Sequence, residues 1–198
     1  MKIDQSLPLE YGTEQGRMNI LGFWIFLGAE IMLFATLFAV YFTLEHRTGN
    51  GPAGAEIFEI APVLIETFLL LTSSFTIGLA IHAMRLGRQK AMLGFFAVTL
   101  LLGLGFLGVE IYEFVHYAHV GAGIQVSAFT ASLLTTLGTH GVHVTLGLFW
   151  GLFIMIQIKK RGLTPANANK SFIFSLYWHF LDVVWIFIFS FIYLKGMM

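Results

Sequence analysis

The chain has 198 residues, of which 57% are hydrophobic and 11% charged, and its eleven basic and eleven acidic side chains balance to zero. A mean hydropathy of +0.81 lies outside the range of soluble domains and inside that of polytopic membrane proteins. Zero net charge does not suggest a nucleic-acid partner. The absence of cysteine excludes disulfides, thiolate metal ligands and a cysteine nucleophile.

Five apolar segments are each long enough to cross a bilayer as a helix, at residues 20–44, 62–84, 92–116, 129–158 and 171–195. The polar start of the chain does not have the pattern of a cleaved signal peptide, so the first span is expected to target the membrane. No internal repeat or low-complexity tract divides the chain. We therefore expect one domain over residues 1–198, an all-α polytopic bundle of five transmembrane helices.

The lysines and arginines indicate how this bundle is oriented. Nine of the eleven, Lys2 among them, flank the start of the first span or lie in the connections after the second and fourth. Only Arg47 and Lys195 flank the other ends of the spans. Because cytoplasmic loops are enriched in basic residues, the N-terminus is predicted to be cytoplasmic and the C-terminus outside.

The last span carries the most unusual pattern, YWHFLDVVWIFIF at residues 177–189. Asp182 falls near the middle of the hydrocarbon, where a carboxylate is costly unless it is paired or protonated. His179 lies three residues earlier, and positions i and i+3 share a helix face. The spacing predicts a buried His179–Asp182 pair.

Other acidic residues also interrupt the spans. Glu30 lies about ten residues into the first span with no basic neighbour in sequence, so it must be protonated or paired across helices; a structural role and a proton-handling role both remain open. Glu66, Glu110 and Glu113 are expected near the outer face, shallow enough to reach interfacial water, which favours a structural role.

His140 and His143 lie three residues apart on the fourth span and, with His179, raise the hypothesis of a metal or haem site. Their depths argue against haem ligation, because His140 is nearer the outer end of its span and His179 nearer the inner end. Hydrogen bonding between helices is the favoured interpretation.

Glycines in the spans are interpreted as packing positions. Gly147 and Gly151 form a GxxxG pair, which lets helices approach closely. Gly103, Gly105 and Gly108 spell GxGxxG, but they lie inside an apolar run without a preceding strand, so a dinucleotide site is excluded.

Six motifs in chain order resemble subunit III of the haem-copper terminal oxidases: GFWIFLGAE (22–30), ETFLLLTSS (66–74), GVEIYEFVH (108–116), GTHGVHVTLGL (138–148), KKRGLT (159–164) and SLYWHFLDVVWIFIF (175–189). The sequence is most similar to the five-helix form in bacterial quinol oxidases of the aa and bo types. Longer family members have seven helices, and this chain matches their last five.

The resemblance implies a redox-silent subunit of a bacterial cell-membrane complex that oxidises quinol, reduces dioxygen to water and pumps protons. Haems and copper belong to subunit I, the complex binds quinol and phospholipid, and the partners are subunits I and II with a small subunit IV. No residue of this chain is then catalytic or metal-binding. By the match of motifs, these polar positions become structural, lipid-cleft or proton-antenna candidates: Glu30, His140, His143, His179, Asp182, Glu66 and Glu110.

Alternatives remain at this point. A second, related hypothesis is subunit III of a cytochrome c oxidase or of a nitric-oxide-reductase-linked complex; because other subunits specify the electron donor, only sequence similarity favours the quinol oxidase. A free-standing proton-coupled transporter using Glu30 and Asp182 would need an internal repeat or broken helices at the midplane, and neither is visible.

Overall fold

The computed structural model describes residues 7–49 and 51–197, and every described element is helical. The elements are α1 (Glu14–Leu44), α2 (Gly54–Ile57), α3 (Ile60–Arg85), α4 (Gln89–His119), α5 (Ala128–Arg161), α6 (Pro165–Ile188) and a π-helix, η1 (Phe189–Leu194). Five of the helices, with η1 continuing the last, are long and apolar enough to cross a membrane. The all-α fold with five spans is confirmed. Lys2 and the two ends of the expected 1–198 domain lie outside the described residues.

Each helical span is longer than predicted, mainly because polar residues at one or both ends are also helical. The Thr13 side chain accepts a hydrogen bond from the Gly16 amide (3.0 Å), which starts α1 six residues before the expected position. Thr164 caps α6 in the same way, with Pro165 in the first turn. Hydropathy detects the membrane-embedded part of a helix and misses capped turns beyond it.

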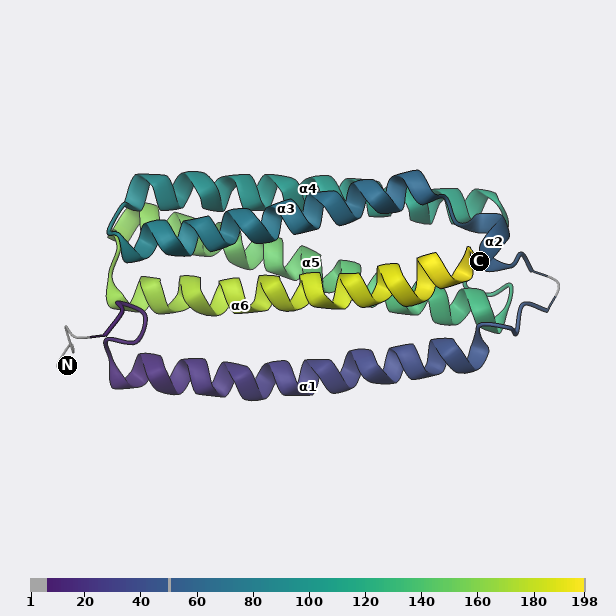
Figure 1. Ribbon diagram of the computed structural model, residues 1–198, viewed down its shortest axis with the longest axis horizontal. Coiled ribbons are helices and arrows are strands. Elements are labelled where there is room, and N and C mark those ends of the chain that lie inside the picture. The colour runs from purple at the N-terminus through teal and green to yellow at the C-terminus, as the bar shows by residue number, and fades with distance from the viewer. Residues whose placement is uncertain (1–6, 50, 198) are drawn as a thin grey trace.

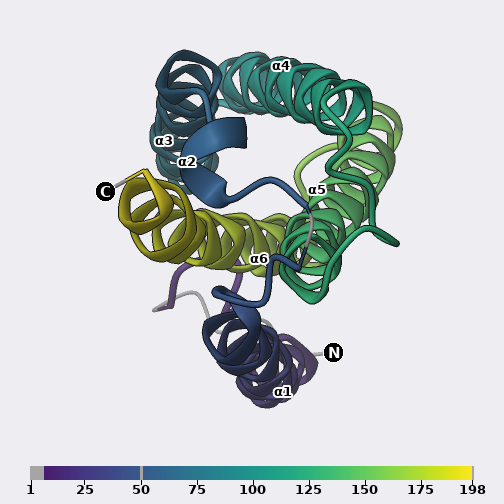
Figure 2. The same cartoon turned by 90° about the vertical axis from the view of Figure 1, so that its right-hand side faces the viewer.

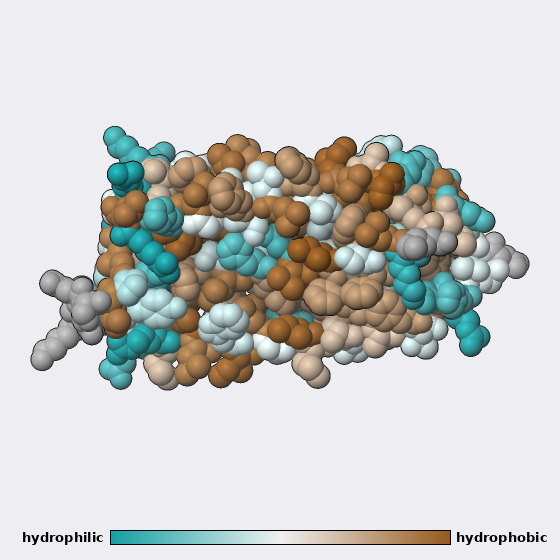
Figure 3. Space-filling view, in the orientation of Figure 1, coloured by the Kyte–Doolittle hydropathy of each residue, from teal (hydrophilic) through white to brown (hydrophobic). Residues whose placement is uncertain are grey.

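Helices α3, α4, α5 and α6 form a closed ring, and α1 lies outside it (Figure 2). α1 packs mainly against α5 and α6. The long helices run side by side, so α1 begins at one end of the bundle and η1 ends at the other (Figure 1). Apolar side chains cover most of the middle of the visible surface, around a small polar patch, and polar ones gather at both ends, the pattern of a membrane-spanning bundle (Figure 3).

Aromatic side chains fill the ring. Trp178 and Trp185 of α6 are fully buried, and the Trp178 indole nitrogen donates to the Ser73 hydroxyl of α3 at 2.9 Å. A Cβ atom at Gly103 would lie 2.8 Å from the Trp178 ring, whereas one at Gly108 would meet nothing within 4 Å. The GxGxxG pattern therefore contains one packing glycine that makes room for an indole.

The GxxxG pair on α5 has the expected role. A Cβ atom at Gly147 would approach the Tyr177 and Trp178 rings to 3.1 Å, and one at Gly151 would lie 2.7 Å from a Leu100 methyl group. Both glycines allow α5 to pack closely against its neighbours.

The short helix α2 covers the end of the ring where η1 ends (Figure 2). Phe58, the residue after α2, packs its ring against Tyr193 with the centroids 5.0 Å apart, and against Tyr117 at 6.5 Å. This cover was not predicted from the sequence, and it closes the bundle interior at that end.

Candidate functional site

The polar segment of α6 does not contain the predicted pair. His179 Nδ1 lies 2.6 Å from the Ser74 hydroxyl of α3. Asp182 is buried, and neither of its carboxyl oxygens has a hydrogen-bond partner among the described residues, although Ser74 also lies close by. The prediction of a buried His179–Asp182 pair is wrong, because the imidazole is hydrogen-bonded to a hydroxyl group of the neighbouring helix α3 instead.

Glu30 is paired across helices, one of the two alternatives that its sequence position left open. Its Oε2 lies 3.1 Å from His143 Nε2, and 113 residues separate the two along the chain. The side chains keep 14% and 16% of their surface exposed, so the pair is partly open at the α1–α5 contact. The Phe34 ring packs against the imidazole with centroids 5.3 Å apart.

The Glu30–His143 contact holds one shared proton. His143 Nδ1 lies 2.7 Å from the Thr139 carbonyl and must carry a hydrogen to donate to it. If the imidazole is neutral, Nε2 is an acceptor and the Glu30 carboxyl must supply the proton; if the imidazole is charged, the carboxylate accepts. Both arrangements place one proton between Nε2 and Oε2.

His140 lies three residues before His143 on α5, but it contacts α6 rather than α1. It is fully buried, its Nε2 donates to the Leu181 carbonyl of α6 at 3.3 Å, and its ring packs against both Phe106 and Trp185, which also contact each other. Among residues 7–49 and 51–197, no group of three or more His, Asp or Glu side chains converges as metal ligands. The three histidines therefore bind separate partners on neighbouring helices.

The expectation that Glu66, Glu110 and Glu113 reach interfacial water is wrong. Glu66 is completely buried, and Glu110 and Glu113 are each 4% exposed. The reason is the cover at this end of the ring, where Phe58, after α2, packs against Tyr117 and Tyr193, the two residues whose hydroxyls donate to Glu113.

The three acids have unequal hydrogen bonding. Oε2 of Glu113 accepts from the hydroxyls of Tyr193 (2.6 Å) and Tyr117 (3.3 Å). Both oxygens of Glu66 and both of Glu110 lack a partner among the described residues. A Cβ atom at Gly141 of α5 would lie 2.6 to 2.8 Å from the Glu110 carboxyl, so a glycine makes room for this group.

Several partners of these polar side chains were not predicted from the sequence. Tyr117 follows Glu113 by one helical turn and was detectable from spacing. Tyr193 and Ser74 were not, because each meets its partner through the tertiary structure. At the opposite end, Glu10 accepts from Arg85 Nη2 (2.8 Å) and Nε (2.9 Å), a contact between the segment before α1 and the end of α3.

An apolar groove of about 500 Å³ runs between α1 and α6. Aromatic and aliphatic side chains from both helices, among them Trp24, Phe38 and Phe187, form its wall, and His179 is the one ionisable residue lining it. A groove of this kind between membrane helices suits an acyl chain.

The fold and the polar contacts define a polytopic, all-helical membrane protein whose spans are joined by hydrogen bonds between helices. The sequence profile described as "Cytochrome c oxidase subunit III" matches residues 13–197. The chain therefore belongs to the cytochrome c oxidase subunit III family, whose members are subunits of multi-subunit haem-copper oxidases.

Two named relatives are similar over nearly their whole length. "Quinol oxidase subunit 3" of Bacillus subtilis (strain 168) is 59% identical over 194 residues, covering 98% of this chain and 95% of that protein. "Probable quinol oxidase subunit 3" of Staphylococcus aureus (strain NCTC 8325 / PS 47) is 53% identical over 188 residues, covering 93% and 92%.

Proposed function

We propose that this chain is the third, non-catalytic subunit of a bacterial quinol oxidase, a multi-pass protein of the cytoplasmic membrane. In such a complex, quinol is oxidised, dioxygen is reduced to water and protons are pumped. The observation that carries the proposal is the identity of 53% to 59%, over at least 93% of the chain, with relatives named quinol oxidase subunit 3.

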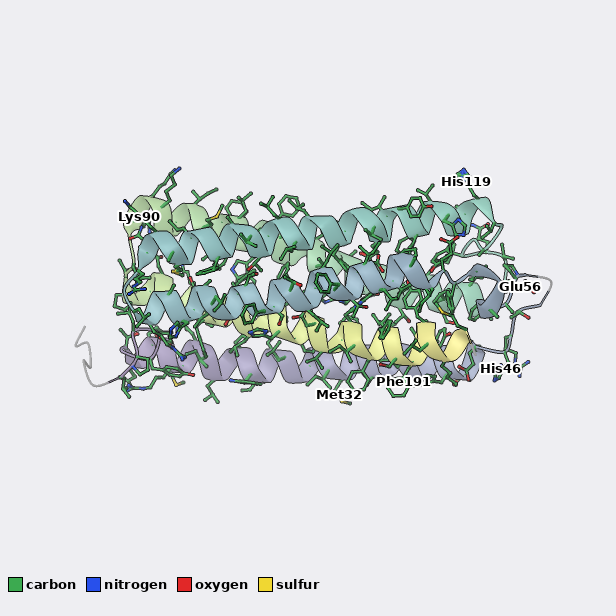
Figure 4. The ribbon with its side chains drawn as sticks, turned by 45° about the horizontal axis from the view of Figure 1, so that its top comes forward. Met32, His46, Glu56, Lys90, His119 and Phe191 are labelled. Carbon is green, nitrogen blue, oxygen red and sulfur yellow. The ribbon has the colours of Figure 1, made fainter. Side chains whose placement is uncertain are left out.

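The partners in this proposal are subunits I and II and a small subunit IV, with the haems and copper on subunit I. The α1–α6 groove is the proposed seat of a phospholipid acyl chain, since its wall is almost entirely apolar. The N-terminus is proposed to be cytoplasmic, because the basic ends of the spans, represented by Lys90, lie together at one end of the bundle (Figure 4).

Glu30 and His143 are the proposed proton-antenna residues of this chain. They share one proton, they lie within the membrane-spanning helices, and they remain partly exposed where α1 meets α5. His140, His179 and Asp182 are proposed as structural residues, since they lie inside the bundle or on the wall of the groove.

Purification of the tagged chain from native membranes in mild detergent tests the assignment. We expect copurification with a larger haem- and copper-bearing subunit, and loss of the visible spectrum when that subunit is removed. Oxygen consumption with ubiquinol, menaquinol and reduced cytochrome c then identifies the donor, and activity with a quinol alone is expected.

Two outcomes would contradict the proposal. Activity with cytochrome c and none with either quinol would assign the chain to a cytochrome c oxidase. A chain that purifies alone and colourless, and that transports a solute with protons in vesicles, would be a transporter.

A further inference from the structure

Three carboxyl groups from two helices are buried at the end of the ring that η1 and α2 close. Glu66 comes from the first turns of α3, and Glu110 and Glu113 share one face near the end of α4. Each lies within electrostatic range of the others. The sequence separates Glu66 from the other two by more than forty residues, so only the antiparallel packing of α3 and α4 brings them together.

Few groups are available to stabilise negative charge there. The two tyrosine hydroxyls both donate to one oxygen, Oε2 of Glu113. The four carboxyl oxygens of Glu66 and Glu110 are buried without a donor among the described residues, and none of the ion pairs between described residues includes Glu66, Glu110 or Glu113. Neighbouring carboxylates repel each other in a low-dielectric interior, so these groups are stable there only with bound protons.

The π-helix η1 positions Tyr193 for the shorter of the two hydrogen bonds to Glu113. In a regular α-helix, Tyr193 would be rotated by roughly 80° from Trp185, away from the ring interior. The wider π-turn of residues 189–194 brings Tyr193 back under Trp185, with the ring centroids 6.0 Å apart, and puts its hydroxyl on Glu113. The distorted turn thus positions a donor at the acid cluster.

A narrow surface crevice at this end has one of the three acids, Glu113, in its lining. Glu113 and Tyr117 line it together with Glu59 and His116, whose side chains are 54% and 29% exposed. His116 Nε2 lies 3.7 Å from Glu59 Oε1 at the mouth. Glu56 and His119 mark the same end of the bundle in Figure 4. Ionisable groups therefore extend from the surface to the buried acids.

We propose that Glu66, Glu110 and Glu113 form a proton-binding site that exchanges protons, through His116 and Glu59, with the aqueous medium at the η1 end of the bundle. The ionisable groups facing the site are Tyr117 of α4, Tyr193 of η1 and, in the crevice lined by Glu113, Glu59 and His116. This site is separate from the Glu30–His143 pair, which lies at the α1–α5 contact outside the ring. The proposed proton-binding site does not depend on which electron donor the complex uses.

Infrared difference spectroscopy of the complex tests the proposal. The complex is reconstituted with one orientation into phosphatidylglycerol–phosphatidylethanolamine vesicles, and the pH is stepped separately on each side. We expect a carbonyl band of protonated carboxylic acids that decreases when the pH is raised at the η1 end. Glu66→Gln and Glu110→Gln should each remove part of this band.

Two further variants keep the test decisive if the glutamine variants fail to assemble. Tyr193→Phe should shift the Glu113 carbonyl band, since it removes the 2.6 Å hydrogen bond. Glu59→Gln should slow proton exchange several-fold, whereas Glu56→Gln, on the same end but outside the crevice, should leave the rate unchanged.

Three results would overturn the proposal. The first is a carboxylic-acid band that none of these variants alters. The second is a band that responds only to the pH at the opposite end. The third is a band that appears only after monovalent or divalent cations are removed, which would make this a cation site.

Discussion

The Oε2 atom of Glu30 on α1 lies 3.1 Å from Nε2 of His143 on α5, and this contact joins the outlying helix to the ring in the middle of its length. Asn19 donates to Asn169 near the start of α1, and Lys195 contacts Glu45 at its end. Most other contacts of α1 are apolar. Since apolar side chains gain little by leaving lipid for a helix, these polar contacts specify where α1 docks.

Glu30→Gln separates docking from proton handling. The amide can still bond His143, so assembly should be retained, with a stability change of about 1 kcal/mol or less. The amide cannot carry the shared proton, so activity should be lost faster during sustained turnover, as followed by oxygen consumption over time.

Glu45→Gln is the matched control, because it makes the same change at the residue that follows the same helix, in the exposed contact with Lys195. It should show wild-type durability. Equal durability of Glu30→Gln and the wild type would remove Glu30 from the proton role.

Ser74→Ala and Asp182→Asn should differ in stability, in the opposite order to that expected from a His179–Asp182 pair. Loss of the Ser74 hydroxyl leaves His179 Nδ1 without its partner and should cost roughly 1–2 kcal/mol. Asp182→Asn keeps the size of a side chain that has no hydrogen bond and should be nearly neutral. Thermal denaturation of the purified complex measures both. A larger loss for Asp182→Asn would show that Asp182 has a partner that this chain does not supply.

Gly141→Ala should destabilise the bundle by about 1–3 kcal/mol, because the new methyl group would occupy the position of the Glu110 carboxyl. Gly138→Ala, on the same helix, meets its nearest atom at 3.8 Å and should be neutral or slightly stabilising. Adding Glu110→Ala to Gly141→Ala should recover part of the loss, since the two sites share one space. Additive losses would show that the carboxyl does not occupy this space.

Arg85→Gln should loosen the segment that precedes α1. It leaves the buried Glu10 carboxylate without its guanidinium partner, at a cost of about 1–3 kcal/mol given that Arg85 is half exposed. Limited proteolysis before α1 and thermal denaturation would detect the change. Arg88→Gln, three residues on at an exposed position, is the control and should behave as the wild type. Equal behaviour of the two variants would argue against the Glu10–Arg85 contact.

Much of the fold could be predicted because the bilayer acts on each segment separately. A run of about twenty apolar residues specifies a spanning helix without reference to its neighbours, so the number of spans and the all-α class followed from hydropathy. The family also followed, since motifs such as that at residues 177–189 combine ionisable and aromatic residues in an order that composition does not produce. The ends of the helices did not follow, because capped polar turns such as that at Thr13 lie beyond the hydrophobic window.

The partners of the polar residues were decided only by the tertiary structure. Sequence spacing predicted that His179 pairs with Asp182. The packing of α6 against α3 instead places the imidazole within hydrogen-bond distance of the Ser74 hydroxyl. Glu30 needed a partner, and only the docking of α1 on α5 identified His143. The acids near the end of α4 looked shallow, and the cover from α2 with the π-turn at Tyr193 makes them a buried cluster. Hydropathy reports how deep a residue lies along its own helix, whereas hydrogen bonding depends on which helix faces meet, and that is set by packing across the whole bundle.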